Sequence, residues 1–325
     1  MPSFQLATTF LGQPCGIGWT EGVNPEMRER LQAAERTIRA AYDAAATPEQ
    51  TDAEAGDDAQ AGDEAAAFER WAGVSGPHLC WLPNAAQHSA GAAIDINPAA
   101  NPYIVTRHGD VPGGEPGGDE LVAMRRHALA VFDRAMRFAG GSEAFADVEP
   151  RRPGEATDAV WRRFKAVSDA LAEYLRCAVD AEPAESTRVA LENADEVGDD
   201  ELLAAIPEGE RLPLDGAVAA LATRLGSASR ARAQYVRIVR DYELVRIPLV
   251  IGAPSATPAR TRNPARGFLH LPREIVTALC DQGLRWGACD FPIRPDGTSE
   301  NGAMMHFDLA DSGGYPEINS LLRFG

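Results

Sequence analysis

The sequence predicts an α+β protein in which a few short strands are combined with many helices. Apolar residues recur at helical spacing in several separate segments. Strand-like apolar runs are short by comparison, as in Leu79–Leu82 and Leu249–Ile251. With 325 residues the chain can bury a full core, and its length suits one elaborated domain or two small ones.

Helices are expected where capping residues and periodicity coincide. Asn24-Pro25 is a good N-cap and first-turn pair, so a helix should begin there and run to about residue 45. Pro272 should start the last helix, and Gly283 should end it. The clearest pattern begins at Thr157, a candidate N-cap, and places five apolar residues on one face: Val160, Phe164, Val167, Leu171 and Leu175. This helix is expected at 157–179, and further helices are expected at 65–72, 119–138, 214–225 and 231–242.

The charge pattern argues against two classes of partner. The formal net charge is −17, which disfavours a nucleic acid or an anionic membrane surface as the main partner. No apolar run is long enough to span a bilayer, so no transmembrane segment is expected. The first residues, Met1–Ala7, lack a basic region followed by an apolar core, so no secretory signal is expected and the protein should be made in the cytoplasm. Residues 46–66 are acidic and small, which is typical of a flexible loop.

The five cysteines include no Cys-x-x-Cys pair. An odd number of widely spaced cysteines favours reduced thiols over a disulfide framework. Cys280 lies on the apolar side of an expected helix, where a buried, inert thiol is the simplest interpretation.

Two distant segments carry the residue types of a metal site. His88 and Asp95 are separated by six small or apolar residues, and His306 lies in a second apolar run, Met304–Leu309. Gly91 in the first segment allows a tight turn. Two imidazoles and one carboxylate are the protein ligands of many catalytic zinc ions, which keep a fourth position open for water. We therefore predict Zn²⁺ bound by His88, Asp95 and His306.

Both segments resemble the VanY-type D-alanyl-D-alanine carboxypeptidases and L-alanyl-D-glutamate peptidases, the LAS zinc peptidases, which have a hedgehog-like fold and cut cell-wall peptides. Their first motif reads roughly Ser-x-His-x-x-Gly-x-Ala-x-Asp-Ile-Asn, often followed by Asn-Pro-Tyr. Ala86 stands here in place of the Ser, and the matching residues are His88, Gly91, Ala93, Asp95, Ile96, Asn97 and Asn101-Pro102-Tyr103. The second half of the family commonly reads Gly-hydrophobic-x-Trp-Gly-Gly and, further on, Met-His-Phe. These stretches are matched by Gly283–Ala288 and Met305–Leu309.

The resemblance also implies how the chain is organised. A small antiparallel sheet that binds zinc would form from residues 65–108 and 262–325, as a zinc peptidase core. Residues 1–64 would add an N-terminal helix and the acidic loop, and residues 109–261 would be a large, mainly helical insertion. Such an insertion would cover the site, receive another protein, or pack on the back of the core, and the sequence leaves these alternatives open.

The resemblance fails at one important position. Relatives place a Glu or Asp three residues before the second His, where it takes a proton from water and passes it to the leaving amine. This chain has Ala303 there. Three explanations stay open: a catalytically silent relative, a neighbouring acid that has taken over the role (Glu300 before Asp290 or Asp296), or a replacement of the acid in an otherwise active hydrolase.

Further site residues are expected around the metal. Tyr103, Arg107 and Trp286 are the candidates for binding substrate, with Arg285 and Arg294 as other cations able to bind a carboxylate. Asp308 follows His306 by two residues and would point to the same side of a strand. It would either orient an imidazole or be only the polar position of an edge strand.

These features predict a zinc-dependent peptidase acting on peptidoglycan stem peptides, of the DD-carboxypeptidase or LD-endopeptidase type. The enzyme would be inactive as given if no other acid takes the role expected at position 303. The main alternative is a non-catalytic zinc module that binds wall peptide or a protein partner. A third is an intracellular dipeptidase-like enzyme. A wall-cutting enzyme without a signal would need lysis or a secretion machine, as an antibacterial effector does, and so a delivery or immunity protein as partner.

Overall fold

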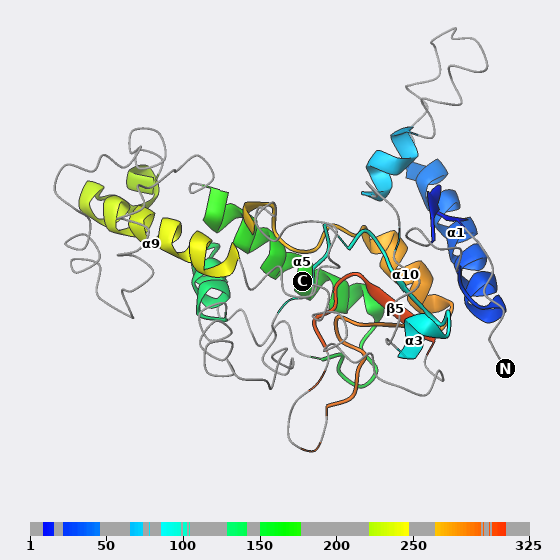
Figure 1. The fold of residues 1–325 in the computed structure, drawn as a ribbon. Coiled ribbons are helices and arrows are strands. Elements are labelled where there is room, and N and C mark those ends of the chain that lie inside the picture. The colour runs from blue at the N-terminus through cyan, green and yellow to red at the C-terminus, as the bar shows by residue number, and fades with distance from the viewer. Residues whose placement is uncertain are drawn as a thin grey trace, which may run out of the picture.

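The structure is a computed structural model that describes residues 9–15, 22–45, 66–73, 78, 86–98, 100–102, 104, 129–141, 150–176, 221–246, 264–293, 295, 299 and 301–309. Within these residues, helices combine with two small antiparallel sheets, which confirms the α+β class. The elements in chain order are β1 (Thr9–Phe10), β2 (Gln13–Pro14), α1 (Pro25–Ala45), α3 (Ala86–Ser89), β3 (Ala93–Asp95), α5 (Thr157–Leu175), α9 (Ala228–Arg246), η5 (Pro264–Arg266), α10 (Arg273–Asp281), β4 (Leu284–Trp286) and β5 (His306–Leu309) (Figure 1).

The larger sheet has three antiparallel strands in the order β3-β5-β4, so β5 is the central strand. Asp95 lies opposite His306, and Asp308 lies between Ala93 and Arg285. Side chains alternate between the faces of a sheet, so these five residues share one face. The other face is apolar and carries Leu284, Trp286, Ile94, Phe307 and Leu309.

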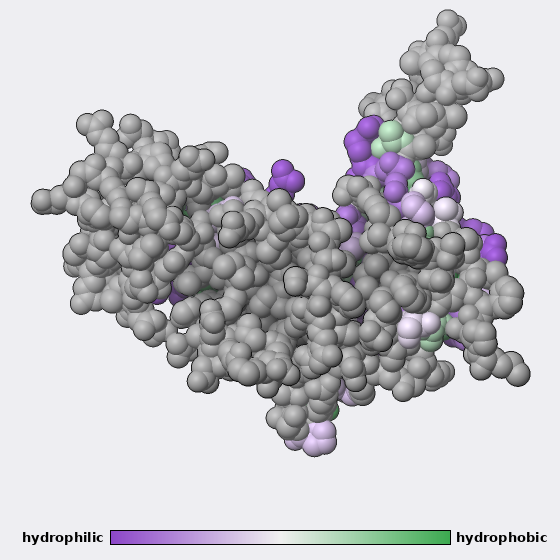
Figure 2. Space-filling view, viewed as in Figure 1, coloured by the Kyte–Doolittle hydropathy of each residue, from purple (hydrophilic) through white to green (hydrophobic). Residues whose placement is uncertain are grey.

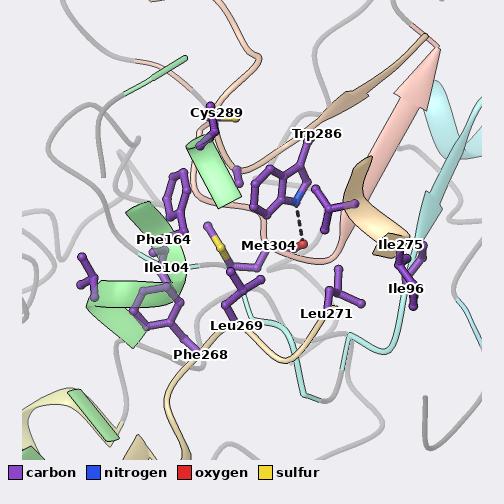
Figure 3. Close-up of a cluster of buried hydrophobic side chains, with 14 of the residues drawn as sticks. Ile96, Ile104, Phe164, Phe268, Leu269, Leu271, Ile275, Trp286, Cys289 and Met304 are labelled. Atoms are coloured by element: carbon purple, nitrogen blue, oxygen red, sulfur yellow. Dashed lines mark hydrogen bonds between the residues drawn. The ribbon is translucent and has the colours of Figure 1, made fainter. Parts of the chain in front are cut away.

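The apolar face of the sheet packs against α5. Trp286 stacks on Phe307 with 6.3 Å between ring centroids, and Phe164 from α5 meets the Trp286 ring edge-on at 5.5 Å. Figure 3 shows the rings of Trp286 and Phe164 among apolar side chains that precede or belong to α10, namely Phe268, Leu269, Leu271 and Ile275. The core of the sheet is therefore completed by a helix from the middle of the chain.

The predicted helix α1 is confirmed at both ends. Its first turn is capped by Asn24, whose Oδ1 accepts a hydrogen bond from the backbone N–H of Met27 at 2.8 Å. Its buried stripe has helical spacing and consists of Met27, Leu31, Ala34 and Ile38. Helix α1 lies beside α10 (Figure 1), which it contacts along this side.

Helix α5 has the predicted buried face but a different cap. All five of the apolar residues expected on that face are buried. The N-cap is Ala156 rather than Thr157, and it makes no side-chain capping bond. The Thr157 hydroxyl instead accepts a hydrogen bond from Arg151 at 3.1 Å, which removes it from the capping position. The sequence signal found the helix and misplaced its cap by one residue.

The other helical predictions are confirmed where the structure describes them. Helix α9 is longer than the expected 231–242, and residues 66–72, 129–138 and 221–225 are helical. Helix α10 follows Pro272 and is closed by Gly283, whose positive φ of 78° is accessible to glycine at little cost. The expected strands Leu79–Leu82 and Leu249–Ile251, and most of the acidic segment 46–66, lie outside the described residues.

Three helices of the middle segment are joined by a buried ion pair. Arg134, from the helix at 129–138, donates to both carboxylate oxygens of Asp241 in α9, at 2.7 and 2.6 Å. Tyr174 in α5 donates its hydroxyl to the same carboxylate at 2.7 Å. Asp241 and Tyr174 have no exposed surface.

Figure 2 shows one face of the molecule. The described side chains exposed around α1 on this face are mainly hydrophilic. Ile293, at 46% exposure, is the large hydrophobic residue exposed among the described residues. No helix in the described part of the chain is long and apolar enough to cross a membrane.

Candidate metal centre

The strand register brings together two of the three predicted metal ligands, although 211 residues separate them in sequence. Asp95 ends β3 directly opposite His306, which begins β5. His306 Nδ1 lies 2.8 Å from Asp95 Oδ1. This pairing follows from the antiparallel ladder, because directly opposed residues place their side chains next to each other on one face.

His88 reaches the same point through a tight turn. It lies in the short helix α3, and the backbone N–H of Gly91 donates to the carbonyl of His88 at 3.0 Å. Gly91 has a positive φ of 66°, which glycine adopts without strain and which the sequence had indicated. The turn places His88 Nε2 at 3.4 Å from Asp95 Oδ1.

The three side chains fit a metal ion. One ligand atom from each of His88, Asp95 and His306 can be chosen so that all lie within 4.8 Å of one another. Ligand atoms of a tetrahedral zinc with bonds of ~2.0–2.1 Å lie about 3.3 Å apart. The separations of Asp95 Oδ1 from His306 Nδ1 and from His88 Nε2, 2.8 and 3.4 Å, are close to this spacing. All three residues are buried. Asp95 Oδ2 is also buried and makes no hydrogen bond to any residue that the structure describes, so a ligating position is open on this carboxylate.

The electrostatics of the group suit a cation. Burial opposes the charge of Asp95, but His88 and His306 outweigh burial and hold the pKa of this carboxyl well below its usual range. Burial also disfavours the imidazolium of His306, but hydrogen bonds to Asp308 and Asp95 prevail and raise its pKa to about 9. A proton and a metal ion compete for the same nitrogen lone pair, so metal binding at Nδ1 would release this proton.

Asp308 lies behind His306 on the central strand, which shows that the edge-strand interpretation of this residue was wrong. Asp308 Oδ2 lies 3.4 Å from His306 Nε2. Arg285 donates to both oxygens of Asp308, at 2.8 and 2.9 Å. Burial opposes the charge of Asp308, but His306 and Arg285 lower the pKa of this carboxyl. Arg285 is thus paired within the protein rather than presented to a substrate carboxylate.

Position 303 lies beside the metal group. The carbonyl of Ala303 accepts a hydrogen bond from the N–H of His306 at 3.2 Å, and its own N–H donates to Gly287 at 3.2 Å. A Cβ at Gly287 would lie 2.9 Å from His306 Cβ and 3.0 Å from Ala303 Cβ. A methyl group at this position can neither accept nor donate a proton.

Two of the three substitute acids lie outside the described residues, namely Glu300 and Asp296. The third, Asp290, uses both carboxylate oxygens in hydrogen bonds within the protein. Its Oδ1 accepts from Arg151 at 2.6 Å, and its Oδ2 accepts from the backbone N–H of Trp286 at 2.8 Å. The structure therefore gives Asp290 a structural role.

Trp286 is a core residue rather than part of the metal group. It is fully buried on the apolar face, opposite to the face that carries His306, and its indole N–H donates to the carbonyl of Met304 at 2.9 Å (Figure 3). This corrects the expectation that it binds substrate, because an indole in the core cannot be reached by a ligand. The other two candidates, Tyr103 and Arg107, lie outside the described residues.

Phe291 and Asn301 lie next to the metal group, although no sequence motif pointed to them. The Phe291 ring lies 5.8 Å from that of His306. Asn301 fixes Phe291 by a reciprocal pair of hydrogen bonds, accepting from its N–H and donating to its carbonyl, both at 2.9 Å. No local signal marks either residue, because both contacts depend on tertiary structure.

Comparisons with protein-family models, with curated proteins and with solved structures found no match. The metal group therefore rests on its geometry and its donor atoms.

Proposed function

We propose that this protein is a zinc-dependent peptidase that acts on peptidoglycan stem peptides, with DD-carboxypeptidase or LD-endopeptidase specificity. One observation carries the proposal: His88, Asp95 and His306 form a buried group that fits a metal ion. The same three residues are the ones that match the motifs of the LAS zinc peptidases. Two imidazoles and a carboxylate favour zinc over calcium or magnesium, which prefer oxygen ligands.

Each residue has a defined task in this proposal. His88, Asp95 and His306 hold the zinc ion, and zinc, when bound, supplies Lewis-acid activation of the scissile carbonyl and of the attacking water. The face of the sheet opposite the metal group is sealed by Trp286 and Phe307. Proton transfer to the leaving amine needs an acid near His306, and Ala303 supplies none. General acid–base help is worth ~10²–10⁴-fold, so the chain as given should turn over slowly unless Glu300 takes this role.

The test combines metal content with hydrolysis. Purified protein should bind about one zinc ion per chain, and His88→Ala or His306→Ala should abolish binding. His270→Ala, which changes a histidine outside the metal group, is the matched control and should retain zinc. Ala303→Glu should increase cleavage of muropeptides by ~10²-fold or more without changing zinc content. Full zinc occupancy in a His88→Ala, His306→Ala double variant would contradict the metal assignment.

The alternative is a zinc-containing module that binds wall peptide or a protein without cleaving it, and Ala303 is the observation that favours it. Under this alternative, Ala303→Glu stays inactive on muropeptides and on short L,D-peptides despite full zinc loading. Saturable binding of muropeptide by the zinc-loaded protein would then distinguish a wall-peptide module from one that binds a protein.

A further inference from the structure

We propose that Asp308 and Arg285 are a positioning pair that fixes the His306 ring, so that Nδ1 is directed to the metal and Nε2–H to the Asp308 carboxylate. This inference rests on the metal site of the proposed function. It adds two residues that act through His306 rather than on the metal or substrate.

The strand register places Asp308 and Arg285 side by side on the face of the sheet that carries His306. Asp308 follows His306 by two residues on β5 and therefore lies on the same face. Arg285 is the residue of β4 directly opposite Asp308. The order Asp95, His306, Asp308, Arg285 thus runs across one face of three paired strands, and the backbone ladder holds all four residues in register.

Both ring nitrogens of His306 face carboxylates. Nδ1 lies 2.8 Å from Asp95 Oδ1, and Nε2 lies 3.4 Å from Asp308 Oδ2. With the proton of the neutral ring on Nε2, the lone pair on Nδ1 is directed to the position shared with His88 and Asp95. Metal-ligating histidines commonly donate their other N–H to a carboxylate in this manner, which fixes the tautomer and the orientation of the ring.

Arg285 holds the Asp308 carboxylate in one orientation. Its Nε and Nη2 donate one bond to each carboxylate oxygen, so the planar fork prevents rotation of the carboxylate. Asp308 has no exposed surface, and a buried carboxylate without this cation would be strongly disfavoured. The guanidinium lies 5.4 Å from the centre of the Phe291 ring, which also contacts His306. A lysine could replace the charge of Arg285 but not its two parallel N–H donors.

The chain contains a matched control for this pair. Arg151 makes a similar fork to Asp290, at 2.6 and 3.2 Å, and its side chain is 21% exposed, compared with 22% for Arg285. The two pairs anchor the same strand, because Asp290 accepts the N–H of Trp286 at the end of β4. Asp290 is not bonded to His306 in any hydrogen bond that the structure describes.

The experiment measures zinc affinity of the full chain by competition with a chelating indicator, together with the visible spectrum of the Co²⁺-loaded protein. Asp308→Asn should weaken zinc binding by ~10–100-fold and shift the Co²⁺ bands, because the ring loses its anionic acceptor. Arg285→Gln should act in the same direction but less strongly, and Arg285→Lys should restore only part of the loss. The Asp308→Asn, Arg285→Gln double variant should be no weaker than Asp308→Asn. Arg151→Gln should lower the melting temperature while leaving zinc affinity and the Co²⁺ spectrum unchanged.

Each outcome decides the proposal. If the unmodified protein binds zinc, and folded Asp308→Asn and Arg285→Gln bind it equally well with an unchanged Co²⁺ spectrum, the positioning pair is wrong and the metal site stands. If Arg151→Gln weakens zinc binding as much as Arg285→Gln, the effect is general loosening of β4, and the pair is again wrong. If the unmodified protein binds neither metal, the proposed function and this inference both fail. Should Asp308→Asn not fold, the two Arg285 variants give the same comparison.

Discussion

Single buried polar residues hold much of this structure together by satisfying backbone groups. Asn101, the first residue of the Asn-Pro-Tyr match, accepts the backbone N–H groups of His270 and Leu271 at 2.8 and 3.1 Å. Ser168 in α5 does the same for Phe268 and Leu269. A buried donor left without a partner costs about 1–3 kcal/mol, so each of these side chains stabilises the loop before α10. The role of Asn101 within the motif is thus structural.

Buried His78 should make the free energy of unfolding depend on pH. Its ring is fully buried and Nε2 donates to the carbonyl of Phe10 at 2.9 Å. Burial lowers its pKa from 6.5 to about 4, the bond to Phe10 opposing this only in part. The unfolded chain therefore binds a proton more tightly than the folded one. The contribution of His78 is complete above pH 6.5 and falls between pH 6.5 and 4, by up to roughly 3 kcal/mol.

The measurement is urea unfolding at pH 7 and pH 4.5 for the natural side chain and for His78→Gln, which keeps a donor near the Nε2 position. Subtracting the two proteins removes the contribution of all other titrating groups. The free energy of unfolding should decrease less on acidification in His78→Gln. Equal decreases in both proteins would show that His78 does not titrate as stated.

Elements in this protein are joined by polar contacts as well as by apolar faces. The three-stranded sheet separates the two kinds of contact, because one face holds the metal group and the other packs on Phe164 of α5. Helix α5 also meets α9 at the buried cluster of Arg134, Tyr174 and Asp241. Among the described residues, most of the surface pairs join neighbouring turns of one helix, such as Glu35 with Arg39, and contribute little.

We predict that Asp241→Asn lowers the free energy of unfolding by ~3–5 kcal/mol, because it leaves the partly buried Arg134 without its anion. Tyr174→Phe should cost less, about 1.5–3 kcal/mol, since it removes one hydrogen bond to the charged Asp241 and leaves the ion pair in place. The control is Glu173→Gln, which breaks an exposed pair with Arg224 and should change stability by less than about 1 kcal/mol. Chemical denaturation of the three variants gives the ranking, and similar losses for Asp241→Asn and Glu173→Gln would contradict it.

At the scale of the whole molecule, one hydrophobic cluster runs from Phe10 through α1, α5 and α9 to β5. Residues of the predicted N-terminal segment and of the predicted insertion therefore share a core with the sheet. The division at 64, 108 and 261 stays a prediction about chain organisation. The metal group lies where β3 and β5 are paired, and these are the two strands of the three-stranded sheet that are most distant in sequence.

Metal binding should consequently stabilise the entire fold rather than one loop. A ligand that binds only the folded chain adds about 2.7 kcal/mol when its free concentration is a hundred times Kd. Removing zinc with a chelator should lower the melting temperature of the protein, and adding zinc back should restore it. In His306→Ala the melting temperature should not respond to either treatment. A zinc response that persists in this variant would place the stabilising ion elsewhere.

The sequence alone determined the class of the fold, the limits of α1 and α10, the buried face of α5 and the three residues of the metal group. These features depend on local capping, on periodicity, and on residue types at fixed spacing, all of which are encoded over short stretches. Only the tertiary structure decided that Trp286 is a core residue, that Arg285 is paired with Asp308, and that Phe291 lies against His306. Each of these depends on which strand lies beside which and on which face a side chain occupies, and no spacing within one segment specifies a contact such as that of Trp286 with Phe164, which lies in a different part of the chain.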